Sequence, residues 1–168
     1  MIRALGEKVP QVAGSAFVSE AAYVVGDVEI GEGSSVWPGA VVRGDFAKIA
    51  IGRNTQVEDN SVLHSGIPMT IGDNVHIGHG AVVHCRSVGS NVLVGNNAVL
   101  LDGAEVGNDC LICAGAVVAQ GMKVPDRSFV AGVPGEIKKQ VTEEHLARIE
   151  SGVRTYVELA REYRRQGL

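Results

Sequence analysis

Three histidines, His64, His79 and His84, are the residues of this chain whose type and spacing point most directly to chemistry. Imidazole nitrogens bind zinc, and a catalytic zinc ion takes three protein ligands and keeps one position open. The alternative is that two of these imidazoles only stack on an exposed surface. Which of the three can meet depends on the repeat that carries them.

The repeat is a hexapeptide that places an aliphatic residue in register over most of the chain. Its members are Ile30, Val36, Val42, Ile51, Val57, Leu63, Ile71, Ile77, Val83, Val88, Val94, Leu100, Val106, Ile112, Val118 and Val124. The residue three positions later is usually Gly, Asn or Asp, which tolerate a left-handed backbone and so permit a corner. Three short strands and three corners close one triangular coil. We therefore predict an all-β solenoid, a left-handed parallel β-helix of hexapeptide repeats.

Every third hexapeptide lies on the same face of such a prism, with coils about 4.8 Å apart. Arg43, His64 and His84 each follow an aliphatic position at this interval, so we expect them to be neighbours on one face. His79 lies one residue further along in a different column. The arrangement predicts a site shared between subunits of a trimer, with His64 and His84 from one chain and His79 from the next.

The composition fits a single domain that binds neither nucleic acid nor membrane. The chain has 168 residues and a formal net charge of −4, which gives no reason to expect an anionic partner. It shows no signal peptide and no apolar run of transmembrane length. Three cysteines, Cys85, Cys110 and Cys113, argue by their odd number against a disulfide framework. We therefore expect a cytoplasmic protein.

The last part of the chain changes to a helical period. From about Thr142, a suitable N-cap, one apolar stripe is formed by Leu146, Ile149, Val153, Val157, Ala160 and Tyr163. Gly152 is the weak point of this helix. We expect a β-helix domain over 1–135 and a C-terminal helical extension over 136–168, with the stripe docked on the prism or on a neighbouring subunit.

Four segments together resemble the gamma-class carbonic anhydrase family: WPGAVVRGD at 37–45, VEDNSVLH at 57–64, IGH at 77–79 and VH at 83–84. The resemblance implies that the zinc ligands are the three histidines already named. It also implies a homotrimer with the metal between subunits, and iron or cobalt as other metals that such a site can take. The activity implied is the reversible hydration of carbon dioxide to bicarbonate.

The resemblance gives roles to three further residues. Arg43 and Asp45 match a pair that forms a salt bridge across the subunit interface and shapes the site. The competing interpretations are a solvated surface charge for Arg43 and a left-handed corner for Asp45. Glu58 stands where family members often carry Gln, which helps to orient the hydroxide on the metal. Asp59 also follows the motif, in a supporting position.

Departures from the family pattern keep other functions open. Phe46 stands where the best-studied members carry a proton-shuttling glutamate, and the segment 65–70 is too short for the acidic loop that bears another. The alternatives are a metal-binding relative that is not a hydrase, such as a thioesterase-like accessory protein, and a hexapeptide acyltransferase. Tyr156 is similar to a tyrosine that relatives place near the site. We expect Trp37 to pack at a surface or an interface, and the repeat suggests no partner for His76.

Overall fold

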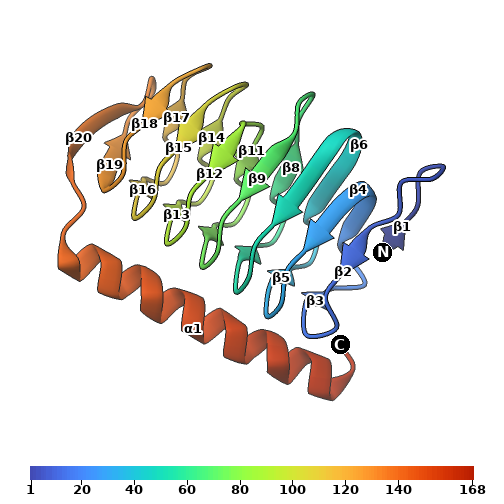
Figure 1. Ribbon diagram of the computed structural model, residues 1–168. Helices are drawn as coiled ribbons and strands as arrows, with labels where there is room; N and C mark the ends of the chain where they lie inside the picture. The colour runs from blue at the N-terminus through green and yellow to red at the C-terminus, as the bar shows by residue number, and fades with distance from the viewer.

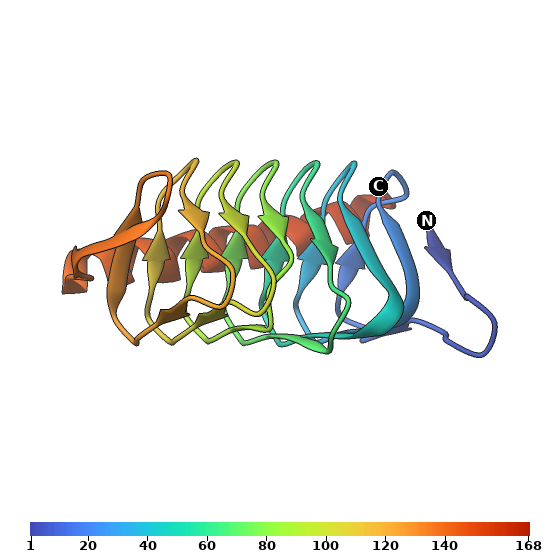
Figure 2. The ribbon, with the colours of Figure 1, turned by 90° about the horizontal axis from the view of Figure 1, so that it is seen from above.

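The computed structural model describes all 168 residues as a three-sided prism of stacked strands with one helix along its side (Figure 1). Its core strands run parallel, and the prism is a left-handed β-helix of hexapeptide repeats, as the sequence predicts. The coils follow one another along the axis, and α1 (Glu143–Gln166) runs back beside them (Figure 2). No helix is long and apolar enough to cross a membrane.

The first face carries two of the three histidines, and we call it the histidine face. It runs through β4, the start of β6, β8, β11, β14 and β17, with β1 at its edge. The strands are β1 (Ile2–Arg3), β4 (Tyr23–Ile30), β6 (Val41–Ile51), β8 (Val62–His64), β11 (Val82–Val83), β14 (Val99–Leu100) and β17 (Val117–Val118).

The second face continues from the first because β6 is long enough to turn a corner. Its residues 41–43 pair with β8, and its residues 49–51 pair with β9. The other strands of this face are β2 (Gln11–Val12), β9 (Met69–Ile71), β12 (Ser87–Val88), β15 (Glu105–Val106) and β18 (Lys123–Val124).

The third face is a separate eight-stranded sheet, and we call it the helix face because α1 packs against its strands β3, β5, β7 and β10. Its strands are β3 (Phe17–Val18), β5 (Ser35–Val36), β7 (Gln56–Val57), β10 (His76–Ile77), β13 (Leu93–Val94), β16 (Leu111–Ile112), β19 (Ser128–Ala131) and β20 (Glu136–Gln140). The last strand, β20, is antiparallel to β19 and leads into the helix.

The aliphatic register fills the interior of the prism. All of its sixteen members are buried, none more than 4% exposed. Glycine permits the close stacking of coils along one column: a Cβ on Gly52 would lie 2.6 Å from the carbonyl oxygen of Gly72, which is inside contact distance. The hexapeptide therefore specifies both the core and the spacing of coils.

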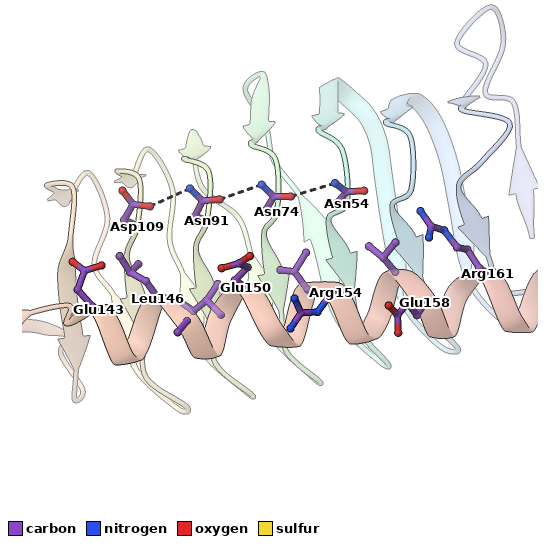
Figure 3. A pocket seen from close by; sticks show the side chains of 14 residues that line it. Asn54, Asn74, Asn91, Asp109, Glu143, Leu146, Glu150, Arg154, Glu158 and Arg161 are labelled. Carbon is purple, nitrogen blue, oxygen red and sulfur yellow. Dashed lines mark hydrogen bonds between the residues drawn. The ribbon is translucent and has the colours of Figure 1, made fainter.

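The corners follow the sequence except at Gly66 and at Asp45, neither of which has a positive φ, and Asp45 concerns the site. Asn54, Asn74 and Asn91 have positive φ, and their side chains hydrogen-bond in a row that ends at Asp109 (Figure 3). The prediction of a left-handed corner at Asp45 is wrong. Asp45 lies inside β6, because the insertion between Val42 and Ile51 lets the chain continue as a strand around the bend.

The helix begins as predicted and buries the predicted stripe. Thr142 is its N-cap and accepts a hydrogen bond from the backbone N–H of His145. Ile149, Val153, Val157 and Ala160 are buried against the prism of the same chain. The prediction of a surface or interface position for Trp37 is wrong, because the helix covers it and leaves it 4% exposed.

Candidate metal centre

The histidine face brings His64 and His84 together as the repeat predicts. Arg43 pairs with His64 across β6 and β8, and Leu63 pairs with Val83 across β8 and β11. The next residues, His64 and His84, are therefore neighbours, with ring centroids 5.2 Å apart. Both side chains are partly exposed, at 14% for His64 and 29% for His84. Two imidazoles thus stand side by side at the surface.

A carboxylate contacts each of these two imidazoles. Asp45 Oδ1 lies 3.0 Å from His64 Nε2, and Asp102 Oδ1 lies 3.1 Å from His84 Nδ1. Arg43 forms an ion pair with Asp45 within the same chain. Desolvation opposes ionisation of Asp45, but hydrogen bonds from Arg43 and from the Phe46 backbone N–H outweigh it and hold the pKa of this carboxyl below its ordinary value.

His79 belongs to a second group of residues beneath the helix, which we call the Glu58 cluster: Glu58, His76, His79 and Tyr156. The Glu58 side chain is 2% exposed, and its Oε2 lies 3.0 Å from His79 Nε2. The same oxygen accepts a hydrogen bond of 3.1 Å from the His79 backbone N–H. Asp59 Oδ2 lies 2.8 Å from the other ring nitrogen of His79.

The rest of the Glu58 cluster holds the other oxygen of this carboxylate. His76 Nε2 lies 2.6 Å from Glu58 Oε1. Burial by itself would raise the pKa of Glu58, but hydrogen bonds from His76 and Tyr156 outweigh it, so the pKa is lowered and the group is ionised at neutral pH. Burial and the neighbouring Glu58 carboxylate raise the pKa of the Tyr156 phenol.

Within one chain these residues form two separate groups. Arg43, Asp45, His64 and His84 lie together, whereas Glu58 and His79 lie elsewhere, and no three His, Cys, Asp or Glu side chains converge on one point. Two contacts were not predicted from the sequence: His76 pairs with Glu58, and Asp102 pairs with His84. The repeat did contain a signal for His76. His76 pairs with Gln56 across neighbouring strands, and the same register places Gly78 next to Glu58, so His76 lies close to Glu58.

The donor chemistry fits a transition metal such as zinc. Each of the three histidines has a carboxylate at hydrogen-bond distance, and metal-ligating histidines commonly donate their second ring N–H to a carboxylate. His84 contacts Asp102 through Nδ1 only, which leaves Nε2 for a ligand. His79 contacts carboxylates through both nitrogens, so one of them must give way before a metal can bind there.

The groove between α1 and the row of asparagines is not this site. It encloses about 980 Å³ and is lined by Asn54, Asn74 and Asn91 on the prism and by Glu150 and Arg154 on the helix, among others (Figure 3). None of the three histidines lines it. We place the candidate chemistry at the histidines because imidazoles are the donors that zinc prefers, whereas the groove is lined by amide, carboxylate, guanidinium and aliphatic groups.

Comparisons with known proteins agree with the repeat and with the motifs. A model described as "Bacterial transferase hexapeptide (six repeats)" matches residues 87–120, and one described as "Hexapeptide repeat of succinyl-transferase" matches residues 49–85. A "Probable carbonic anhydrase" of Methanocaldococcus jannaschii is 46% identical over 85% of this chain and 91% of that protein. The chain belongs to the gamma-class carbonic anhydrase family. "Gamma carbonic anhydrase 2, mitochondrial" of Arabidopsis thaliana is 38% identical over 92% of this chain.

The chain is shorter than one relative, and it shares its fold with a protein named as a transferase. The chain spans about three fifths of the Arabidopsis relative, since the match covers 58% of that protein. Among solved structures, a protein named "hexapeptide transferase family protein" from Anaplasma phagocytophilum has a TM-score of 0.92 and 34% identity, and the match covers 95% of this chain and 96% of that one. Gamma carbonic anhydrase relatives and proteins named as transferases therefore share this architecture, and fold alone does not fix the reaction.

Proposed function

We propose that this gamma-class relative catalyses the reversible hydration of carbon dioxide to bicarbonate with bound zinc, for which iron or cobalt can substitute. The observation that carries the proposal is the pair His64 and His84, two adjacent imidazoles 5.2 Å apart with a carboxylate on each. Membership of a family whose relatives are named carbonic anhydrases supports the same reaction.

The metal would be held between subunits of a homotrimer. One chain offers His64 and His84, and the third ligand would be the partner subunit's His79, because His79 of the same chain lies in the separate Glu58 cluster. Zinc, when bound, supplies a nucleophile at neutral pH because it lowers the pKa of water from about 15.7 to about 7.

The residues around the histidines would orient them and attract the anionic product. Asp45 holds His64 through its Nε2 contact, and Arg43 holds Asp45 through their ion pair. The side chain of Arg43 is 41% exposed, so its guanidinium also presents a positive charge to bicarbonate on this face. Glu58 contacts His79 from beneath the helix, and we assign it to fixing that imidazole.

Phe46 determines where the proton goes. It is 70% exposed and its ring lies 5.7 Å from the His64 ring, at the position where a shuttle would need a titratable group. A phenyl ring cannot accept a proton, so the proton released in each turnover must pass to external buffer. The hydration rate at saturating carbon dioxide should therefore rise with buffer concentration.

Stopped-flow hydration of carbon dioxide by the zinc-loaded protein tests the proposal. The wild type and His145→Ala, a histidine at the start of α1 outside both groups, should hydrate carbon dioxide. His64→Ala should lose more than about 100-fold, because removing even a partner of a metal ligand commonly costs 10- to 100-fold. Equal rates for the zinc-loaded and the metal-free wild type would reject the proposal. A rate that is independent of buffer would reject the role of Phe46.

Acyl transfer or thioester hydrolysis on an acyl-CoA is the second candidate activity. It is supported by the name of the Anaplasma structure. It is also supported by Phe46, because a phenyl ring beside His64 cannot accept the proton that fast hydration must remove. The same preparations should be assayed for release of free CoA from acetyl-CoA and longer acyl-CoAs. CoA release that requires His64 and proceeds without carbon dioxide hydration would move the assignment to this class.

A further inference from the structure

We propose that His76 is a positioning residue, buttressed by α1, that fixes Glu58 against His79 and so lets the C-terminal helix set the orientation of a metal ligand. This inference rests on the proposed function, in which His79 is a ligand. His76 lies in β10 of the helix face, and α1 packs against β3, β5, β7 and β10 of that face.

Glu58 cannot hold its position alone. Its side chain is 2% exposed, and a buried carboxylate is stable only when hydrogen bonds replace its water. An ionised carboxylate only accepts hydrogen bonds, so His76 Nε2 is the donor across the 2.6 Å contact to Oε1. That contact leaves Oε2 for His79.

Glu58 contacts His79 twice. Oε2 lies 3.0 Å from the ring nitrogen Nε2 and 3.1 Å from the backbone nitrogen, so one oxygen fixes both the ring and the chain that carries it. Asp59, the other carboxylate on this ring, is 39% exposed and has only the ring contact. Of the two carboxylates, Glu58 is therefore the rigid partner.

The helix packs against His76. The His76 ring packs edge-on against Tyr156, with centroids 5.0 Å apart. Gly152 lies one helical turn earlier, on the same side of α1. A Cβ on Gly152 would lie 3.3 Å from His76 Nδ1, so glycine allows the helix to approach the imidazole this closely.

This arrangement explains two features of the sequence that the three zinc ligands leave unexplained. A glycine in the middle of a helix lowers its intrinsic stability, yet here it makes room for His76. Glu58 is a charged group in a buried place, and His76 provides the hydrogen-bond partner that such a group requires. Glu58 and His76 therefore act as a pair.

Zinc affinity measured by competition with a chelator tests the pairing. His76→Ala should weaken zinc binding about 10-fold, the lower end for loss of an outer partner of a ligand. The double variant Glu58→Gln with His76→Ala should bind within about 3-fold of Glu58→Gln alone, because an amide does not require a donor to neutralise it. His76→Gln, which keeps an N–H donor, should recover part of the loss. The matched control His145→Ala, which removes a capping contact at the start of the same helix, should bind zinc as the wild type does.

Amide hydrogen exchange on the metal-free protein gives a second readout that does not depend on zinc. In His76→Ala the His79 amide should exchange at least about 10-fold faster, because Glu58 no longer accepts from it in a fixed position. The Gly78 amide, which donates to the Val94 carbonyl at 2.8 Å, should be unchanged, which separates this effect from general loosening of the coil.

The outcomes separate the inference from the proposed function. Unchanged zinc affinity in His76→Ala, or equal losses with and without Glu58→Gln, overturns the pairing. A wild type that binds no zinc overturns the proposed function, and the exchange of the His79 amide then decides the inference on its own. Exchange of His79 and Gly78 that rises equally in His76→Ala would also overturn it.

Discussion

Removing His84 should separate metal binding from folding. The side chain is 29% exposed, lies outside the core, and contacts the His64 ring and Asp102 on the surface of the prism. His84→Ala should therefore cost less than about 1 kcal/mol of folding free energy, as is usual for a surface substitution. For a chain of this size that is at most about 4 °C in melting temperature.

The matched comparison is an inward-pointing residue of the neighbouring strand β8. Leu63 precedes His64 and is fully buried, and a buried leucine replaced by alanine costs about 2–5 kcal/mol. Leu63→Ala should thus lower the melting temperature by roughly 4–20 °C. Both variants are measured by far-UV circular dichroism with a chelator present, so that loss of zinc does not enter the comparison.

Elemental analysis of dialysed protein completes the experiment. His84→Ala should carry no zinc at the shared site, and Leu63→Ala should keep its zinc below its melting temperature. Full zinc occupancy in His84→Ala would show that His84 is not a ligand. Loss of the β-helix signal in His84→Ala would show that the side chain supports the fold.

Two further predictions come from the helix and from the cysteines. Gly152→Ala should displace His76, because the new methyl group would lie 3.3 Å from Nδ1. Zinc affinity should fall, while the helical circular dichroism signal should stay the same or rise. Unchanged zinc affinity would refute the contact. Cys85 should resist iodoacetamide at pH 8 in the folded protein, because burial raises the pKa of its thiol to about 12 and leaves about one molecule in ten thousand ionised. Mass spectrometry should find the partly exposed Cys113 modified first. Early modification of Cys85 would contradict its burial.

The repeat made the fold and the histidine face predictable from sequence. A period of six fixes which residues point inward and which stack, so the adjacency of His64 and His84 and the separation of His79 follow from counting. The helix was predictable for a similar reason, since its apolar stripe begins just after a residue suited to cap it.

The wrong or missing predictions concern residues outside the hexapeptide period, or residues whose contacts come from distant segments of the chain. Asp45 lies in an insertion, where counting from Val42 no longer gives the backbone conformation, and it continues a strand where a corner was expected. Trp37 and His76 lie on the helix face, and their surroundings are decided by where α1 docks. The stripe predicted docking, but it did not fix which strands the helix would cover, so the packing of Tyr156 against His76 was not visible from sequence.

The central claim is that two subunits share each metal site, and mixed trimers test it most directly. Homotrimers of His64→Ala and of His79→Ala should each bind no zinc at the site. Co-expressed chains should form heterotrimers in which one of three interfaces joins the intact His64 and His84 of one chain to the partner subunit's His79. Zinc measured in purified heterotrimers should therefore reach about one ion per trimer, by counting on a closed three-fold ring. No zinc in the heterotrimers would mean that the three histidines do not act across subunits.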